Sequence, residues 1–193
     1  MKHIETKTLV GIGLFTAIVV ILQMMGSFIH FGTFSVSLVL VPIVVGAALY
    51  GRFAGLWLGF VFGLVVLISG DAAPFLTVSP MGTIATVIVK GMLAGLAAGT
   101  VYRIAAKKGD VFAVALSALV CPLVNTGVFL IGCKLFFMAP VTEWAAAMGF
   151  GDNVTAYLFL GLVGGNFLFE TGFNLLLSPV ILRLIHAGQR KSY

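Results

Sequence analysis

Charged residues are scarce in this chain of 193 residues, where they make up 9% of the total. A soluble domain carries about a quarter of its residues as Asp, Glu, Lys and Arg. Hydrophobic residues make up 61% of the chain, and the mean hydropathy is +1.18. This composition excludes an ordinary water-soluble domain and leaves no stretch polar enough to form one beside a membrane region. We therefore predict a single integral membrane domain over residues 1–193.

Side chains that hold metals or act as nucleophiles are also few, with two cysteines and three histidines. Cys121 and Cys133 fall on one expected helix, roughly 18 Å apart at 1.5 Å per residue, which is too far for a disulfide. The sequence contains no G-x-x-x-x-G-K-[ST], H-E-x-x-H or G-x-S-x-G motif. Glu170 is the only acid inside an apolar stretch, so paired catalytic carboxylates are missing too. We expect no enzymatic activity, no cofactor and no metal site.

Long apolar runs take the place of these features, and each is near the length that crosses a hydrocarbon core of about 30 Å. They are continuous, without the alternation of a β-barrel wall, so we predict an all-α bundle of six transmembrane helices. The last two runs are longer than a span needs, and Pro122 and Pro179 are candidate kinks in them. The expected spans are 8–25, 34–50, 53–69, 80–103, 111–138 and 156–186.

Lysine and arginine fall on one side of a six-span arrangement. They lie before the first span, between the second and third, between the fourth and fifth, and at the end of the chain, at Lys2, Lys7, Arg52, Arg103, Lys107, Lys108, Arg183, Arg190 and Lys191. The opposite loops carry Asp71, Glu143 and Asp152, with Lys134 near the end of the fifth span. The positive-inside rule then puts both termini in the cytoplasm. The net charge is +5, and the basic residues lie at helix ends, where they can contact anionic lipid headgroups. The positive charge therefore does not indicate nucleic-acid binding.

Polar side chains deep inside a membrane are costly and usually functional. Lys90 lies about ten residues into the fourth span, or roughly 15 Å deep at 1.5 Å per residue. Asn125 lies at a similar depth in the fifth span, and Glu170 does so in the sixth. Asn166 is one helical turn from Glu170, and Thr86 is one turn from Lys90.

We hypothesise that these groups, from three helices at one level, converge on a small-molecule pocket that opens to the outside. Lys90 and Glu170 either pair with each other or meet charged groups of the ligand, and the asparagines offer donors and acceptors. The structural alternative is a buried ion pair with interhelical amide hydrogen bonds. Trp144 lies in an outer loop expected over 139–155 and is either part of a cover over the pocket or an interface anchor. Gln23 and His30 are weaker candidates on the same side.

Small residues four apart allow helices to approach closely. Gly91, Gly95 and Gly99 in the fourth span are most simply explained by packing inside the bundle. Gly13 and Ala17 in the first span form a second pair of small residues. This pair either packs inside the bundle or is presented to a helix of another protein.

The chain resembles the substrate-binding S components of energy-coupling factor (ECF) transporters. The resemblance covers nearly the whole chain, through its length, its six spans and the stretch Val41-Pro42-Ile43-Val44-Val45-Gly46-Ala47-Ala48-Leu49-Tyr50-Gly51-Arg52-Phe53-Ala54-Gly55. Lys90-Gly91 followed by Ala94-Gly95 supports it, and so does Gly164-Gly165-Asn166.

The resemblance implies high-affinity uptake of a vitamin or other micronutrient across a bacterial or archaeal cell membrane. It also implies a membrane coupling subunit and two cytoplasmic ATPases as partners. Docking in this family commonly uses an A-x-x-x-A motif in the first helix, whereas the corresponding pair here is Gly13 and Ala17.

The substrate stays open at this stage. A zwitterion would suit Lys90 and Glu170, pantothenate would place its carboxylate on Lys90, and riboflavin would place its ring edge on Asn125 and Asn166. Two other functions are compatible with the residues. One is a stand-alone carrier or channel that uses Lys90 and Glu170 for ion coupling, and the other is a structural membrane subunit without a ligand.

Overall fold

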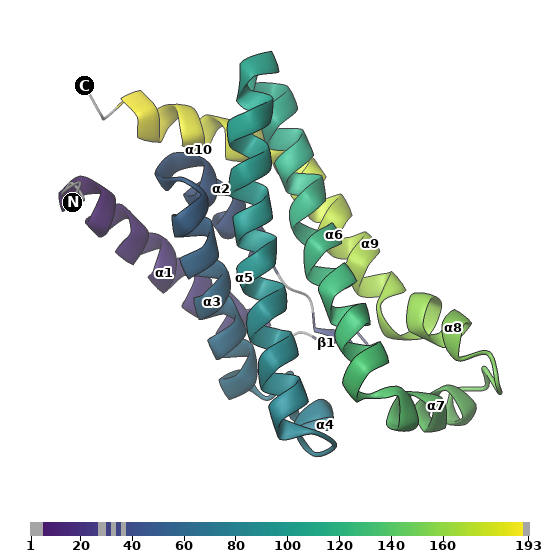
Figure 1. Ribbon diagram of the computed structural model, residues 1–193. Coiled ribbons are helices and arrows are strands. Elements are labelled where there is room, and N and C mark those ends of the chain that lie inside the picture. Colours follow the sequence, from purple (N-terminus) through teal and green to yellow (C-terminus); the bar gives the residue numbers. More distant parts are fainter. Residues whose placement is uncertain (1–5, 27–29, 32–33, 36–37, 191–193) are drawn as a thin grey trace.

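The computed structural model describes residues 6–26, 30–31, 34–35 and 38–190, and nearly all of them are helical (Figure 1). The main elements in chain order are α1 (Thr6–Gly26), β1 (His30–Phe31), β2 (Phe34–Ser35), α2 (Leu40–Tyr50), α3 (Arg52–Ser69), α4 (Ala73–Leu76), α5 (Pro80–Ala105), α6 (Asp110–Phe136), α7 (Met138–Ala147), α8 (Val154–Ala156), a π-helix (Tyr157–Leu162), α9 (Gly164–Leu176) and α10 (Ser178–Arg190). A 3₁₀ turn (Ala106–Lys108) joins α5 to α6. The predictions about Lys2, Lys191 and the His30 side chain lie outside the described residues.

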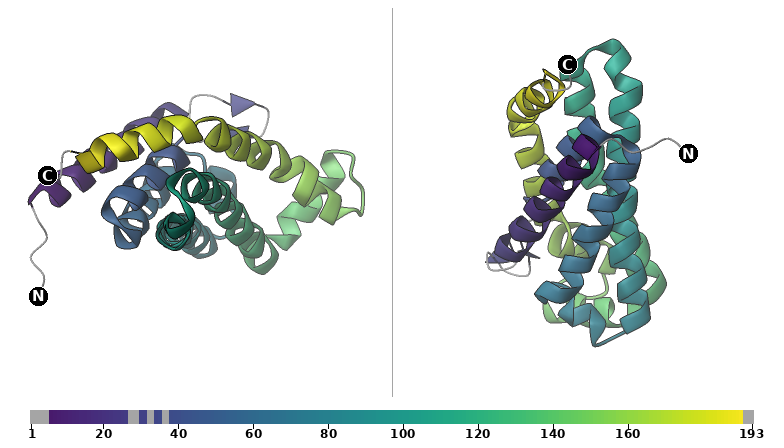
Figure 2. Two further views of the ribbon diagram at one scale, coloured as in Figure 1. Left: turned by 90° about the horizontal axis from the view of Figure 1, so that it is seen from above. Right: turned by 90° about the vertical axis from the view of Figure 1, so that its left-hand side faces the viewer.

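Five helical segments of the described chain are long and apolar enough to cross a membrane. They are Thr6–Gly26, Arg52–Ser69, Pro80–Lys108, Asp110–Phe136 and Val154–Leu176, and α2 is a shorter apolar helix. The fold is therefore that of an all-α membrane protein. The start of α1, the end of α10 and the α5–α6 turn lie toward one end of the bundle, and α4, α7 and α8 lie toward the other (Figures 1 and 2).

The second helix begins later than the sequence led us to expect. The predicted span starts at Phe34, but Phe34–Ser35 forms β2, which pairs antiparallel with β1 in the register His30↔Ser35. In the sequence, Phe34-Ser35-Val36-Ser37 alternates apolar and hydroxyl side chains. This period of two favours extended chain over helix. The prediction of helix from residue 34 is thus wrong, and α2 begins at Leu40.

The predicted span 156–186 is divided at its candidate kink, Pro179, because α9 ends at Leu176 and α10 begins at Ser178. Pro179 lacks an N–H and its ring crowds the preceding turn, so it favours a break or kink and suits the first turn of α10. Figure 1 shows α10 (yellow) crossing the end of the bundle. Its Ile181 and Ile185 are fully buried, and His186 Nε2 lies 2.9 Å from Asp110 Oδ2 at the start of α6.

The fifth predicted span, 111–138, runs two residues too far, because α6 ends at Phe136 and α7 begins at Met138. The loop expected over 139–155 therefore contains a ten-residue helix, α7, followed by a turn with Gly149 and Gly151 at positive φ. Pro122 lies inside α6, which continues on both sides of it.

Glycines set the distance between α3 and α5. A Cβ placed on Gly59 would collide with the carbonyl of Gly91, and one on Gly55 would collide with that of Gly95. The two backbones are therefore in direct contact, as small residues in membrane helices allow. This confirms the prediction that Gly91 and Gly95 serve internal packing. It also holds Phe62, one turn beyond Gly59, beside Lys90 on α5.

Candidate functional site

A cavity of about 140 Å³ lies between the long helices, near the depth of Lys90. Residues from α1, α3, α4, α5, α6, the π-helix and α9 line it, together with Asp71 before α4 and Val163 after the π-helix. The lining residues are Gln23, Phe62, Val66, Asp71, Phe75, Val87, Lys90, Asn125, Thr126, Phe129, Leu162, Val163, Asn166 and Glu170. The structure thus brings together four of the residues singled out in the sequence: Lys90, Asn125, Asn166 and Glu170.

The Lys90 ammonium projects into this cavity between two aromatic rings. Its Nζ lies 5.8 Å from the centroid of Phe62 and 5.2 Å from that of Phe129. Both distances suit a cation–π interaction. Among the residues that the structure describes, no carboxylate lies within ion-pair distance of Nζ. Lys90 and Glu170 face the same cavity without pairing.

Glu170 and the two asparagines form the opposite polar wall. Asn166 Nδ2 donates a hydrogen bond of 3.1 Å to Glu170 Oε1, one turn along α9. The amide of Asn125 on α6 also lies beside this carboxylate. Glu170 Oε2, Asn125 Oδ1 and Asn166 Oδ1 are buried and have no hydrogen-bond partner among the described residues. Asn174, one turn further along α9, instead donates to the Ala118 carbonyl of α6.

A further polar pair at the cavity joins α1 to the start of the α3–α4 segment. Gln23 Nε2 donates to Asp71 Oδ2 at 2.6 Å, and Gln23 Oε1 is buried without a partner in the described part of the chain. Asp71 appeared in the sequence only as an outer-loop acid, and Gln23 only as a weaker candidate. Nothing local to either residue indicates their pairing, because they are 48 positions apart.

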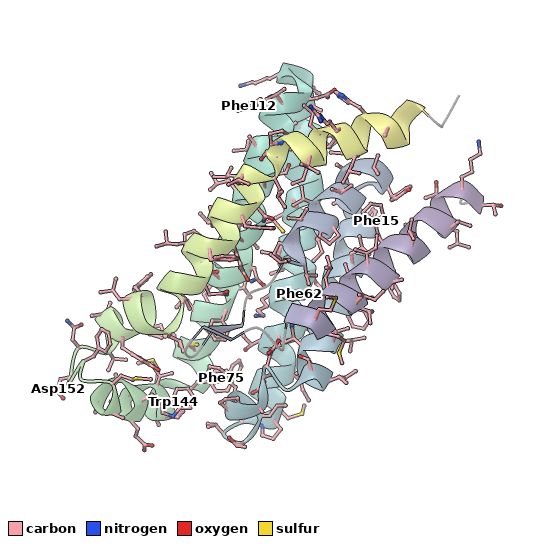
Figure 3. All side chains as sticks on the ribbon, turned by 180° about the vertical axis from the view of Figure 1, so that it is seen from behind. Phe15, Phe62, Phe75, Phe112, Trp144 and Asp152 are labelled. Atoms are coloured by element: carbon pink, nitrogen blue, oxygen red, sulfur yellow. The ribbon has the colours of Figure 1, made fainter. Side chains whose placement is uncertain are left out.

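Aromatic side chains close the cavity at the end of the bundle that carries α4 and α7. Phe75 on α4 lies edge-on to Phe129, Phe137 and Trp144, with ring centroids 5.4, 5.1 and 5.4 Å away. Edge-to-face pairs at these distances are favourable. Figure 3 shows Phe75 and Trp144 together at this end, Phe62 nearer the middle, and Phe112 at the opposite end. Trp144 therefore supports Phe75 and does not itself line the cavity.

Thr86 is also outside the cavity lining. Its side chain fills the contact between α5 and α6, where a Cβ on Gly132 would collide with it. Thr86 lies one turn from Lys90 along α5. At the level of Thr86 the helix packs directly on α6, whereas at the level of Lys90 it borders the cavity. Its hydroxyl is buried without a partner among the described residues.

Gly13 and Ala17 both lie on the exposed face of α1, and a Cβ on Gly13 would meet no neighbouring atom. Leu9, Val10 and Leu14 are more than half exposed on the same helix, at 63%, 67% and 61%. This face of α1 is apolar and is not covered by the rest of the described chain. Gly11, by contrast, is buried against the Tyr50 side chain.

The cavity combines apolar walls with polar groups that still have unused hydrogen-bonding capacity. Its described lining holds one ammonium, two carboxylates, three amide side chains and seven aromatic or aliphatic side chains. Buried polar atoms are nearly always paired, so a cluster of unpaired ones around a cavity indicates a missing ligand or water. No group of three His, Cys, Asp or Glu side chains in the described residues is arranged to hold a metal ion.

A comparison with protein-family models matches residues 7–182 to the family described as "ECF transporter, substrate-specific component". A search of curated proteins finds no match to the chain. The family match covers nearly all of the sequence, including α1 and every helix that lines the cavity. The chain therefore belongs to the family of substrate-specific components of ECF transporters.

Proposed function

We propose that this chain binds a small water-soluble vitamin or related micronutrient with high affinity in the cavity between Lys90, Asn125, Asn166 and Glu170. Members of its family are substrate-binding transport subunits and not enzymes. The observation that carries the proposal is the convergence of polar side chains from α5, α6 and α9 on one cavity, where buried oxygens lack partners. A purely structural subunit would pair these groups with one another, because unpaired buried polar atoms destabilise a fold.

Each lining group has a defined role in this proposal. Lys90 donates to an acceptor or anion of the substrate, and its position between Phe62 and Phe129 leaves its donors free for that contact. The Asn166–Glu170 pair and Asn125 receive polar groups on the other wall. Phe75 and Phe129 pack against apolar parts of the substrate. Thr86 and Trp144 act indirectly, by holding α6 against α5 and by supporting Phe75.

Pantothenate and riboflavin are the two substrates that the sequence suggested, and both remain compatible with some of these groups. A pantothenate carboxylate would meet Lys90, and its hydroxyls and amide would meet the oxygens of Asn125 and Asn166. A riboflavin ring edge would suit the two asparagines, but the three fused rings need more room than a cavity of about 140 Å³ offers.

Uptake in this proposal requires a coupling subunit in the membrane and two cytoplasmic ATPases, which supply the energy. The exposed apolar face of α1 around Gly13 and Ala17 is the proposed docking surface, because small residues there let a partner helix approach closely. The cell membrane of a bacterium or archaeon is the proposed location, with both termini in the cytoplasm.

The test is to purify the chain gently in detergent or nanodiscs and to analyse the released small molecules by mass spectrometry. We expect one water-soluble compound in roughly stoichiometric amount. Uptake into liposomes should then require the coupling subunit, the ATPases and ATP. Uptake by the chain alone would support a stand-alone carrier that uses Lys90 and Glu170, and absence of any bound compound would support a structural subunit.

A further inference from the structure

We propose that the substrate is a small zwitterion, with a protonated nitrogen toward Glu170 and a carboxylate or phosphate toward Lys90. This inference rests on the proposed function, because it assigns a chemical class to the substrate of the same cavity. It follows from which atoms of the cavity are donors, which are acceptors, and how their charges are placed.

Three buried acceptor oxygens, on residues that line the cavity, have a fixed identity. A carboxylate only accepts hydrogen bonds, so the amide atoms that contact Asp71 and Glu170 must be the NH₂ groups of Gln23 and Asn166. The other amide atom of each residue is then an oxygen, and both oxygens are buried without partners in the described chain. Glu170 Oε2 is the third such acceptor. A ligand that reaches these oxygens, by a small turn of the side chains that carry them, must therefore present N–H or O–H donors.

The Lys90 side requires the opposite chemistry. An ammonium only donates, and Nζ has no hydrogen bond or ion pair with a described residue. An aromatic face attracts a cation but offers it no full acceptor. A ligand that satisfies this side must present an acceptor, and an anion compensates the buried charge best.

The charges decide between a neutral donor and a cationic one. The described lining contains one ammonium, Lys90, and two carboxylates, Asp71 and Glu170. Asp71 is only half-buried and has contacts of its own, whereas Glu170 is buried with neutral amides beside it. A substrate with only an anionic group would compensate Lys90 and leave Glu170 without a positive partner among the described residues. A zwitterion compensates Lys90 and places a positive charge against Glu170, so that both of these charges gain a partner of opposite sign.

The size of the cavity sets the third condition. Its volume of about 140 Å³ is close to the roughly 150 Å³ of an engineered cavity that holds benzene. Phe62, Phe75 and Phe129 border it, so a flat or branched apolar body fits between the charged ends. The expected substrate thus has about the size of an amino acid or of a single ring with short substituents.

Purified wild-type protein is incubated with a small-molecule filtrate of yeast extract and, separately, with a defined mixture of compounds from four charge classes. The mixture contains amino acids as zwitterions, choline and thiamine as cations, nicotinate, biotin and pantothenate as anions, and riboflavin as an uncharged ring system. Retained compounds are identified by mass spectrometry after buffer exchange. We expect retention of a zwitterion of the stated size. Retention of an anion, a cation or an uncharged compound alone would overturn the inference and leave the proposed function standing, whereas retention of nothing would contradict both.

Two variants then test the orientation of the retained compound. Glu170→Gln should weaken its binding about a hundredfold, because it removes the charge opposite the ligand's nitrogen. The same variant should affect the ligand's deaminated analogue far less than the ligand itself. Glu143→Gln, an exposed acid on α7, is the matched control and should leave affinity unchanged. An equal loss of affinity for the ligand and for its deaminated analogue in Glu170→Gln would contradict the orientation.

Discussion

At the scale of single residues, the feature that matters most is a lysine inside a membrane domain that has no carboxylate partner among the described residues. The sequence placed Lys90, Asn125, Asn166 and Glu170 at one depth, and the structure brings all four to one cavity. Depth follows from counting positions along a helix, which the sequence allows. Whether Lys90 and Glu170 pair depends on how α5 and α9 are spaced, and the sequence does not contain that distance.

Replacing Lys90 should separate binding from stability. Lys90→Met keeps much of the volume and removes a charge that no described carboxylate pairs with. The unliganded protein should therefore be at least as stable as the wild type, with a gain of up to about 1 kcal/mol. Ligand-induced stabilisation should be lost. Thermal unfolding in detergent, with and without the substrate, measures both. The exposed Lys134→Met, at the end of α6, is the control and should change neither.

The aromatic cover makes a second prediction at this scale. Phe75→Ala should speed dissociation of the substrate at least tenfold, because it opens the cavity at the end where Phe75 packs against Phe129 and Phe137. Trp144→Ala should have a smaller effect, since Trp144 contacts Phe75 and not the cavity. Dissociation rates of the substrate, measured by dilution and rapid filtration, would compare the two variants. A larger effect of Trp144→Ala would put the tryptophan in the site after all.

At the scale of elements, α3 and α5 form the frame on which the cavity is built. Their glycines bring the two backbones into contact, and this places Phe62 next to Lys90. The sequence signalled the glycine spacing on α5, so the use of these residues for packing could be predicted. Their partner helix could not, because small residues on a membrane helix fit several neighbours equally well.

Element boundaries show where the sequence carried too little information. The helices expected over 80–103 and 53–69 correspond to α5 (Pro80–Ala105) and α3 (Arg52–Ser69). Ser79 caps the start of α5 by accepting from the Gly82 N–H, and Pro80 suits the first helical position. The break before α2 was missed, because hydropathy stays high across an extended pair, whereas Pro179 indicated the break after α9. The short helices α4 and α7 were missed for the same reason.

Adding one methyl group to the α3–α5 contact should destabilise the protein. Gly59→Ala places a Cβ against the Gly91 carbonyl, which cannot move without shifting α5. We expect a loss of about 1–3 kcal/mol in the free energy of unfolding, together with weaker substrate binding. Gly127→Ala on α6 is the matched control, because a Cβ there meets nothing within 4 Å. It should be neutral or slightly stabilising, since alanine is a better helix former than glycine.

At the scale of the whole molecule, the two ends of the bundle differ in charge. The α5–α6 turn carries Lys107 and Lys108, and the start of α1 and the end of α10 lie toward the same end (Figure 1). Asp71, Glu143 and Asp152 lie on the segments of the other end, where Phe75 covers the cavity. By the positive-inside rule we therefore predict that the cavity faces the exterior.

Cysteine labelling in intact cells tests this orientation. The native Cys121 and Cys133 are both buried, which limits their background reaction. Asp152→Cys should react with a membrane-impermeant maleimide added outside, and Lys108→Cys should react only after the cells are opened. The reverse pattern would invert the molecule and place the substrate entrance in the cytoplasm.

Assembly with the transporter module should depend on the exposed face of α1. Gly13→Trp and Ala17→Trp each add a bulky group to the proposed docking surface, so co-purification with the coupling subunit should fall sharply while substrate affinity is retained. Gly172→Trp adds the same group to an exposed, uncrowded position on α9 and serves as the control. Intact assembly in the α1 variants would show that the partner docks elsewhere.

The central claim is that side chains from α5, α6 and α9 bind one substrate molecule together. Its most direct test is the dissociation constant of the co-purified compound, measured by titration calorimetry for the wild type and for Lys90→Ala, Asn125→Ala and Asn166→Ala. We predict that each substitution weakens binding at least tenfold, because each removes a hydrogen bond to a buried ligand. Unchanged dissociation constants in all three variants would contradict the account.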